Sequence, residues 1–187
     1  MRVLGIDPGL TRCGVGVVDV SATRTVRLVY FGVIETAHDL PLERRLLAIA
    51  TGIAGVIDEF EPEAVGLERM FAQHNLRTVM GTAQASGVAL QVAASRGLAV
   101  GLHTPSEVKA AITGYGSADK KQVGAMVARV LGLGAAPRPA DAADALAIAI
   151  CHAWKGPAIV AGSASLTPAQ RAWREAERST TARSVNS

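Results

Sequence analysis

The sequence is poor in aromatic residues and in cysteine. Only 4% of its 187 residues are Phe, Trp or Tyr, whereas 49% are hydrophobic and 19 are glycine. A core must therefore be built from Ala, Val, Leu and Ile packed closely around small residues. The two cysteines, Cys13 and Cys151, are too few and too far apart for a disulfide framework or a zinc site. We expect both to be buried free thiols.

Long apolar runs and a secretory signal are also missing. The most hydrophobic run, Ala142 to Trp154, is interrupted by Asp144 and is shorter than the roughly 18 residues that a transmembrane helix needs. The start, MRVLGIDPG, has an acid at position 7 and lacks the apolar segment and cleavage site of a signal peptide. We expect a cytoplasmic protein with no membrane partner.

Charges are segregated along the chain, although the net charge is only +3. Residues 1–68 have six arginines against ten acids, whereas residues 69–138 have eight basic residues against two acids. Three of the four lysines, Lys109, Lys120 and Lys121, fall within thirteen residues. A phosphate-contacting surface needs such a block of positive charge, but a solvated helix face explains it equally well.

Apolar periodicity predicts an α/β protein. Short runs rich in Val, Ile and Leu predict five strands, at 2–6, 14–20, 25–36, 64–67 and 98–103. Helices are expected at 41–60, at 75–96, from Thr104, from a cap at Ser117 to about Leu131, and at about 140–154. Three early strands followed by strands alternating with helices predict a five-stranded mixed sheet with helices on both faces.

Three further segments predict a helix start, a packing surface and a tail. Thr104 and Glu107 form a capping-box pattern at a helix start. Small residues recur every fourth position along the second helix, from Gly81 to Ala93, and form a ridge suited to close packing, either on a second copy of the chain or on its own sheet. Residues 157–187 are rich in Ala, Ser, Thr and Arg, and we expect them to form a flexible basic tail.

Four acids occur where carboxylates are energetically unfavourable. Asp7 and Glu68 each end a near-continuous apolar run, which is typical of a central strand. Asp141 and Asp144 are three residues apart among alanines, so they project from one face of a helix. If these acids converge, repulsion and desolvation destabilise the fold unless cations compensate. Oxygen ligands favour Mg²⁺ or Mn²⁺ over zinc, and two such ions can hold the attacking and leaving oxygens of a phosphodiester displacement.

Each acid also has an explanation without a metal. Asp7 could begin a turn and Asp141 could cap a helix. The other two acids could form salt bridges to Arg69 or Arg138. As a set, however, the four acids favour the metal site.

Several motifs together resemble one known family. In order along residues 1–154 they are LGIDPGLTRCGVGVV, VGLERMF, GTAQASGVAL, EVKAAITGYGSADKKQV and DAADALAIAI. They resemble the RuvC family of bacterial Holliday junction resolvases. The resemblance implies a ribonuclease H-like fold over residues 1–156, a homodimer, and two-metal cleavage of symmetric strands at four-way junction DNA. It also implies that the chain works with the RuvA and RuvB branch-migration proteins.

The resemblance also implies site residues. The catalytic and metal-binding acids fall on Asp7, Glu68, Asp141 and Asp144, which would bind two Mg²⁺ ions per active site, with Mn²⁺ as a substitute. A two-fold symmetric dimer would place one such site at each of the two equivalent strands of a junction. The expected products carry a 5′-phosphate and a 3′-hydroxyl.

Five further residues are candidates for DNA contact. Lys109 and Lys120 match basic positions near the family's active site and could neutralise phosphate charge or assist the transition state, whereas Lys121 could be only a solvated neighbour. Phe71 lies in a mostly polar link and could stack on or wedge between bases, or could pack under the following helix. Arg77 could contact a phosphate or remain a surface residue.

Three other functions fit parts of the sequence. The GIDPG turn also opens actin-like ATPases and sugar kinases, but two such lobes need a much longer chain and no second phosphate loop appears. A non-catalytic junction-binding protein would explain the basic segment and leave the four acids unexplained. An RNA-processing nuclease shares the opening motif, but the DAADALA helix and the basic run favour the resolvase.

Overall fold

A five-stranded mixed sheet forms the centre of the structure. The structure is a computed structural model that describes residues 1–69 and 76–155, without the side chains of residues 76–78. The strands are β1 (Arg2–Asp7), β2 (Arg12–Val20), β3 (Val26–Glu35), β4 (Ala64–Glu68) and β5 (Ala99–His103). Their order across the sheet is β3-β2-β1-β4-β5, with β1 antiparallel to β2 and parallel to β4. The predicted strands and mixed sheet are confirmed. The predicted tail at residues 157–187 lies outside the described residues.

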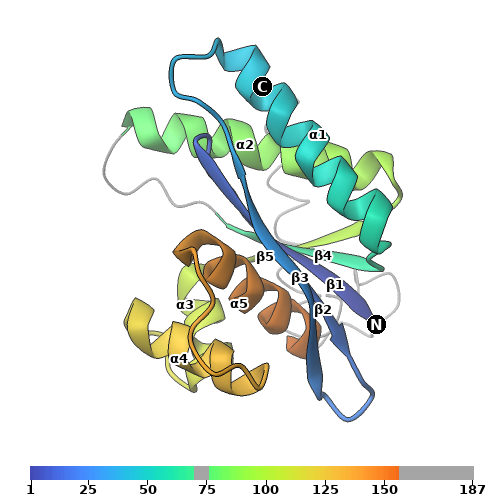
Figure 1. Cartoon of the computed structure of the whole chain (residues 1–187), viewed down its shortest axis with the longest axis vertical. Helices are drawn as coiled ribbons and strands as arrows, with labels where there is room; N and C mark the ends of the chain where they lie inside the picture. The colour runs from blue at the N-terminus through green and yellow to red at the C-terminus, as the bar shows by residue number, and fades with distance from the viewer. Residues whose placement is uncertain (70–75, 156–187) are drawn as a thin grey trace, which may run out of the picture. The chain divides into compact units, whose positions relative to one another are not determined.

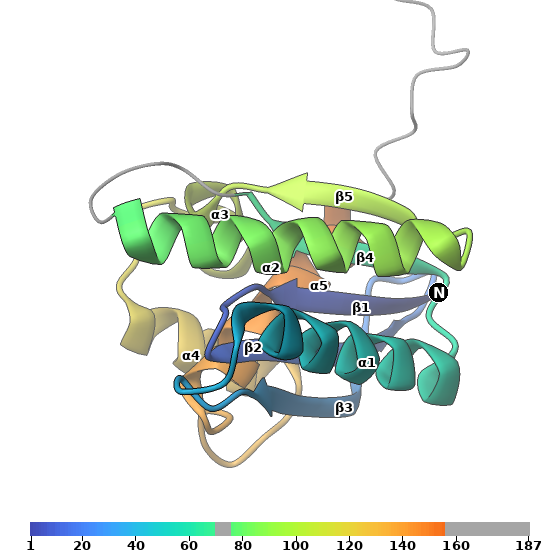
Figure 2. The same ribbon diagram turned by 90° about the horizontal axis from the view of Figure 1, so that it is seen from above.

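Helices cover both faces of the sheet, as predicted (Figures 1 and 2). On one face lie α1 (Leu42–Phe60) and α2 (Leu76–Ser95), and on the other lie α3 (Pro105–Thr113), α4 (Lys120–Val130) and α5 (Ala140–Lys155). Each face has its own apolar cluster, and Cys13 and Cys151 are buried free thiols within these clusters. None of the described helices is long and apolar enough to span a membrane.

The two short helices before α5 begin with capping boxes. At α3 the Thr104 hydroxyl accepts a hydrogen bond from the backbone N–H of Glu107, whose carboxylate accepts one from the N–H of Thr104, as predicted. The prediction that Ser117 caps α4 is wrong, because the N-cap is Asp119. Asp119 has Gln122 three residues later to complete a reciprocal capping box, whereas Ser117 is followed at that distance by a lysine.

The small-residue ridge of α2 packs inside the chain. Ala85, Ala89 and Ala93 are buried in the same cluster as Ile49 and Ile53 of α1. The sequence left open whether this ridge faces its own sheet or a second copy of the chain. The structure places it against its own sheet and α1.

Helix α5 lies unusually close to the sheet because glycines face it. A Cβ atom at Gly5 in β1 would overlap the backbone carbonyl of Ala145, and one at Gly14 in β2 would overlap that of Asp141. The facing positions on α5 are mostly alanines, so neither partner holds the other away. This close contact determines where on the sheet Asp141 and Asp144 lie.

Substitution of Gly5 by Ala is therefore expected to destabilise the fold by about 3 kcal/mol or more, because the added methyl group overlaps backbone atoms that cannot rotate away. Chemical denaturation of the two proteins measures the difference. Gly55→Ala in the exposed face of α1 is the matched control: nothing lies within 4 Å of its Cβ position, and we expect a stabilisation of up to about 1 kcal/mol. Equal effects of the two substitutions would contradict the close contact.

Candidate active site

Two carboxylates meet at one edge of the sheet. Asp7 ends β1 and Glu68 ends β4, and the two strands are parallel neighbours in which Ile6 pairs with Leu67. Because both strands end at the same edge, the two carboxylates are adjacent although 61 positions separate them. Both side chains are half-buried.

Helix α5 adds a third carboxylate to this edge. Asp7, Glu68 and Asp144 line one pocket of ≈ 270 Å³, together with Lys109 from α3 and Lys120 from α4. The rest of the pocket lining is apolar and consists of Pro105, Val108, Val123, Ala147 and Ile148. The predicted convergence of acids from distant parts of the chain is therefore present for these three residues.

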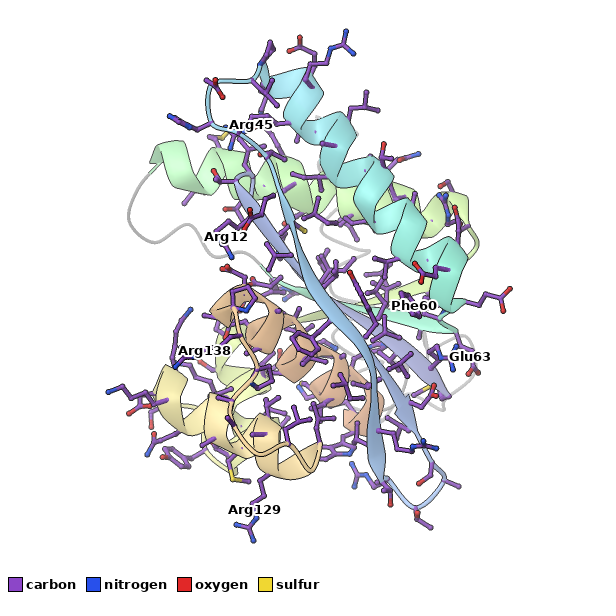
Figure 3. All side chains as sticks on the ribbon, in the orientation of Figure 1. Arg12, Arg45, Phe60, Glu63, Arg129 and Arg138 are labelled. Atoms are coloured by element: carbon purple, nitrogen blue, oxygen red, sulfur yellow. The ribbon has the colours of Figure 1, made fainter. Side chains whose placement is uncertain are left out.

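Asp141 lies on the flank of this pocket and is not part of its lining. Its Oδ2 accepts a hydrogen bond from Nε of Arg12, 2.6 Å away, and the same guanidinium forms an ion pair with Glu35. Figure 3 labels Arg12 among the side chains. Asp141 is in the first turn of α5, so it is not the N-cap residue that the sequence allowed. It still contributes to the negative potential at Asp7.

Burial and the clustering of negative charge change the protonation of two carboxyl groups in the pocket, those of Asp7 and Glu68. Burial, reinforced by the charges of Glu68, Asp144 and Asp141, raises the pKa of Asp7 to about 7. Burial and the charge of Asp144 also raise the pKa of Glu68. Lys120 opposes both shifts. Asp7 therefore binds a proton at a pH where an exposed aspartate is fully ionised.

Basic partners are unevenly distributed among the four acids. Nζ of Lys120 lies 3.0 Å from Oδ2 of Asp144, whereas Asp7 and Glu68 have no ion pair within residues 1–69 and 76–155. In that range Glu68 pairs with neither Arg69 nor Arg138. The salt-bridge explanation thus holds for Asp144, through a lysine rather than an arginine, and not for Glu68.

The donor set fits a hard divalent cation in its chemistry. All four candidates offer carboxylate oxygens, which Mg²⁺ and Mn²⁺ prefer, and Asp7 and Glu68 carry charge that no described basic side chain neutralises directly. However, no three His, Cys, Asp or Glu side chains in the described parts of the chain lie close enough together to hold one ion. For Asp144 and Asp141 to join Asp7 around a cation, each must part from a basic partner.

The predicted DNA contacts divide into three groups. Lys109 and Lys120 line the pocket. Lys121 is exposed on α4 and does not line it. Arg77 lies in the first turn of α2 with its side chain outside the description, and Phe71 lies outside the described residues altogether.

Two residues near the pocket had no signal in the sequence. Arg12 begins β2, and it meets Asp141 only because α5 crosses the sheet at that point. His103 pairs with Glu68 across β4 and β5, and its Nε2 lies 2.9 Å from Nδ1 of His152 on α5. Both histidines are buried.

Fold and pocket together define a class of enzyme. Ribonuclease H-like nucleases have a five-stranded mixed sheet with helices on both faces. In them the central strands and one crossing helix bring carboxylates to a single pocket, as they do here. The chain has this fold.

Comparison with known proteins gives the family within that class. The family model described as "Crossover junction endodeoxyribonuclease RuvC" matches residues 3–152. A curated relative of that name from Leifsonia xyli is 68% identical, over 96% of this chain and 93% of its own length. One from Renibacterium salmoninarum is 59% identical, over 95% of this chain and 92% of its own. The chain belongs to the RuvC family of crossover junction endodeoxyribonucleases.

Solved structures agree with this assignment. Thermus thermophilus RuvC in complex with a Holliday junction substrate superposes with a TM-score of 0.79 at 39% identity, covering 83% of this chain and 94% of that chain. The yeast mitochondrial Holliday junction resolvase Ydc2 shares the fold, with a TM-score of 0.56 at 15% identity over 80% of this chain and 77% of that one.

The raised pKa of Asp7 predicts a pH-dependent effect of Asp7→Asn. In the unfolded chain Asp7 loses its proton near its ordinary pKa of 3.8, and in the fold only near 7, so its charge costs stability increasingly as the pH rises through that window. In EDTA, Asp7→Asn should therefore raise the free energy of unfolding by roughly 2 kcal/mol at about pH 8 and by less than half as much at about pH 5. Thermal or urea unfolding at the two pH values measures this, and an equal gain at both would contradict the assigned shift.

Proposed function

We propose that this chain resolves Holliday junctions by metal-dependent hydrolysis of two symmetrically placed phosphodiester bonds, leaving 5′-phosphate and 3′-hydroxyl ends. One observation carries the proposal: Asp7, Glu68 and Asp144 share a pocket with Lys109 and Lys120 in a chain whose match to the RuvC family spans residues 3–152. A pocket with acids alone would repel a phosphate, and one with lysines alone would bind it without cutting.

The proposed metal is Mg²⁺, two ions per active site, with Mn²⁺ as a substitute. Asp7, Glu68, Asp141 and Asp144 would hold these ions. When bound, the ions would supply an activated water and stabilise negative charge on the leaving 3′ oxygen. Two observations support this assignment: the ligands are carboxylate oxygens, and burial and neighbouring negative charge raise the pKa values of Asp7 and Glu68.

Asp7 couples cation binding to pH. A carboxyl group must release its proton before it binds a cation, and the pKa of Asp7 is about 7. Cation binding should therefore weaken as the pH falls below neutrality. Glu68, whose pKa is also raised, acts in the same direction.

Lys120 and Lys109 give the pocket its affinity for phosphate. The ammonium of Lys120 is held against Asp144, yet 79% of its side chain is exposed, so it can exchange this partner for a phosphate oxygen without crossing a packed region. Lys109 is half-buried on α3 and lies where its charge stabilises that of Glu68. Both side chains can neutralise charge that develops on the scissile phosphate.

Contacts outside the pocket are proposed from the sequence resemblance. Phe71 would stack on or wedge between bases at the branch point, and Arg77 would contact a phosphate. Lys121, next to Lys120 but outside the pocket, would contribute only to general attraction of DNA.

A homodimer would place one such pocket at each of two equivalent strands. Large apolar side chains remain exposed on α2, with Met80 at 58% and Leu90 at 38%, so α2 offers an outer face for such contact. Cooperation with RuvA and RuvB, and a cytoplasmic location, remain expectations from the sequence.

The first test compares a mobile four-way junction with linear duplex of the same sequence, with Mg²⁺ or with EDTA. We expect paired symmetric nicks in the junction only, and only with metal. Asp7→Asn should bind the junction with unchanged affinity and cut it at least about 100-fold more slowly, because a ligand of the ion is lost. Equal cutting of the linear duplex, or hydrolysis of ATP by the protein, would contradict the proposal.

The second test uses the adjacent lysines as a matched pair. Lys120→Ala should slow junction cleavage at saturating protein by about 10-fold or more, because a charge facing the scissile phosphate is removed. Lys121→Ala removes the same charge one residue away, and we expect it to change the cleavage rate less than about two-fold while weakening binding at low salt. Equal effects on the single-turnover rate would show that the two lysines act only through general electrostatics.

A further inference from the structure

Arg12 has no role in the proposed chemistry, yet it makes the shortest polar contact of the described residues to any of the four acids. We propose that Arg12 is a positioning residue that holds Asp141 on the flank of the pocket and competes with the active-site cation for this carboxylate, and that Glu35 determines how strongly it competes. This inference rests on the proposed role of Asp141 as a metal ligand.

The contact between Arg12 and Asp141 is built into the fold. Arg12 is the first residue of β2, and its register partner in β3 is Glu35, so the two side chains start from paired backbone positions. Two residues further along β2, Gly14 lies directly against the backbone carbonyl of Asp141. The backbones that carry Arg12 and Asp141 are therefore held together by the α5–sheet contact, independently of their side chains.

The two aspartates of α5 have different counterions, which come from different elements. Asp144 is paired with Lys120, which comes from α4 and lines the pocket. Asp141 is paired with Arg12, which comes from the sheet and is not part of the lining. A phosphate that enters the pocket can draw Lys120 away from Asp144, but it has no such direct access to Arg12. Release of Asp141 therefore needs a different partner for the guanidinium.

Glu35 supplies this partner. It forms an ion pair with the same guanidinium and is itself 64% exposed, so it can keep Arg12 when Asp141 turns to a cation. The Arg12 side chain is 41% exposed, and ion pairs of this kind are weak enough to exchange. Removing Arg12 should free Asp141 and strengthen cation binding. Removing Glu35 should leave Arg12 wholly to Asp141 and weaken cation binding.

The experiment titrates the full chain with Mn²⁺ at a pH above neutrality and measures free Mn²⁺ by electron paramagnetic resonance. Binding that is lost in Asp7→Asn is assigned to the active site. We expect Arg12→Gln to bind Mn²⁺ about two- to five-fold more tightly than the wild type, the range that a partly exposed ion pair contributes. Glu35→Gln should bind about two-fold more weakly.

Two controls separate competition from a general effect of charge. Arg96 precedes β5, at the end of the sheet opposite Glu68, and it forms an ion pair with Asp58 of α1. Arg96→Gln therefore removes an arginine far from the acids, and it should leave Mn²⁺ binding unchanged. In the Arg12→Gln background, Glu35→Gln should have no further effect, because Glu35 acts through Arg12.

Weaker or unchanged Mn²⁺ binding in Arg12→Gln would overturn the inference, as would an equal gain in Arg96→Gln or an undiminished effect of Glu35→Gln in the double variant. These results would leave the proposed function standing as long as the wild type binds Mn²⁺ and Asp7→Asn does not. If the wild type shows no binding that depends on Asp7, the proposed metal site fails and the role of Arg12 fails with it.

Discussion

The site depends on the close contact between α5 and the glycines of the central strands. At Gly5 and Gly14 even a methyl group would overlap the helix backbone, so the helix can lie this close to the sheet only because these two residues have no side chain. Two of the four acids are carried by α5, and the other two end β1 and β4. The glycine contact therefore sets the distance between carboxylates that lie more than 130 positions apart in the chain. The contact of α5 with these glycines therefore both packs the core and brings the carboxylates together.

Bringing these carboxylates together destabilises the fold at the proposed active site. Asp7 and Glu68 are brought together partly buried, near other carboxylates and without an ion-pair partner in the described residues, and burial and the neighbouring negative charge raise both pKa values. Lys120 and Arg12 offset part of the charge, each on one aspartate of α5. Such partly exposed pairs hold the acids in place and still exchange readily, which the proposed binding of cations and phosphate requires.

The sequence predicted what local patterns determine. Apolar periodicity and capping patterns located the five strands and five helices, and the apolar runs before Asp7 and Glu68 indicated that each acid ends a central strand. Ser117 was wrong as a cap because Asp119 competes for the same helix start with a better partner. The spacing of small residues in α2 suits packing on its own sheet and on a second copy of the chain equally well, so the sequence left the partner of this ridge open. Arg12 could not be found, since residues 12, 35 and 141 meet only through strand pairing and helix packing.

The most direct test of this account is a crystal structure with Mn²⁺, in which anomalous scattering locates the ions independently of the protein. We predict Mn²⁺ bonded to a carboxylate oxygen of Asp7 and to at least one oxygen from α5, with α5 still seated on the glycines of β1 and β2. Manganese bound only away from Asp7, or an ion at Asp7 that no residue of α5 touches, would contradict the claim that this helix contact builds the catalytic site.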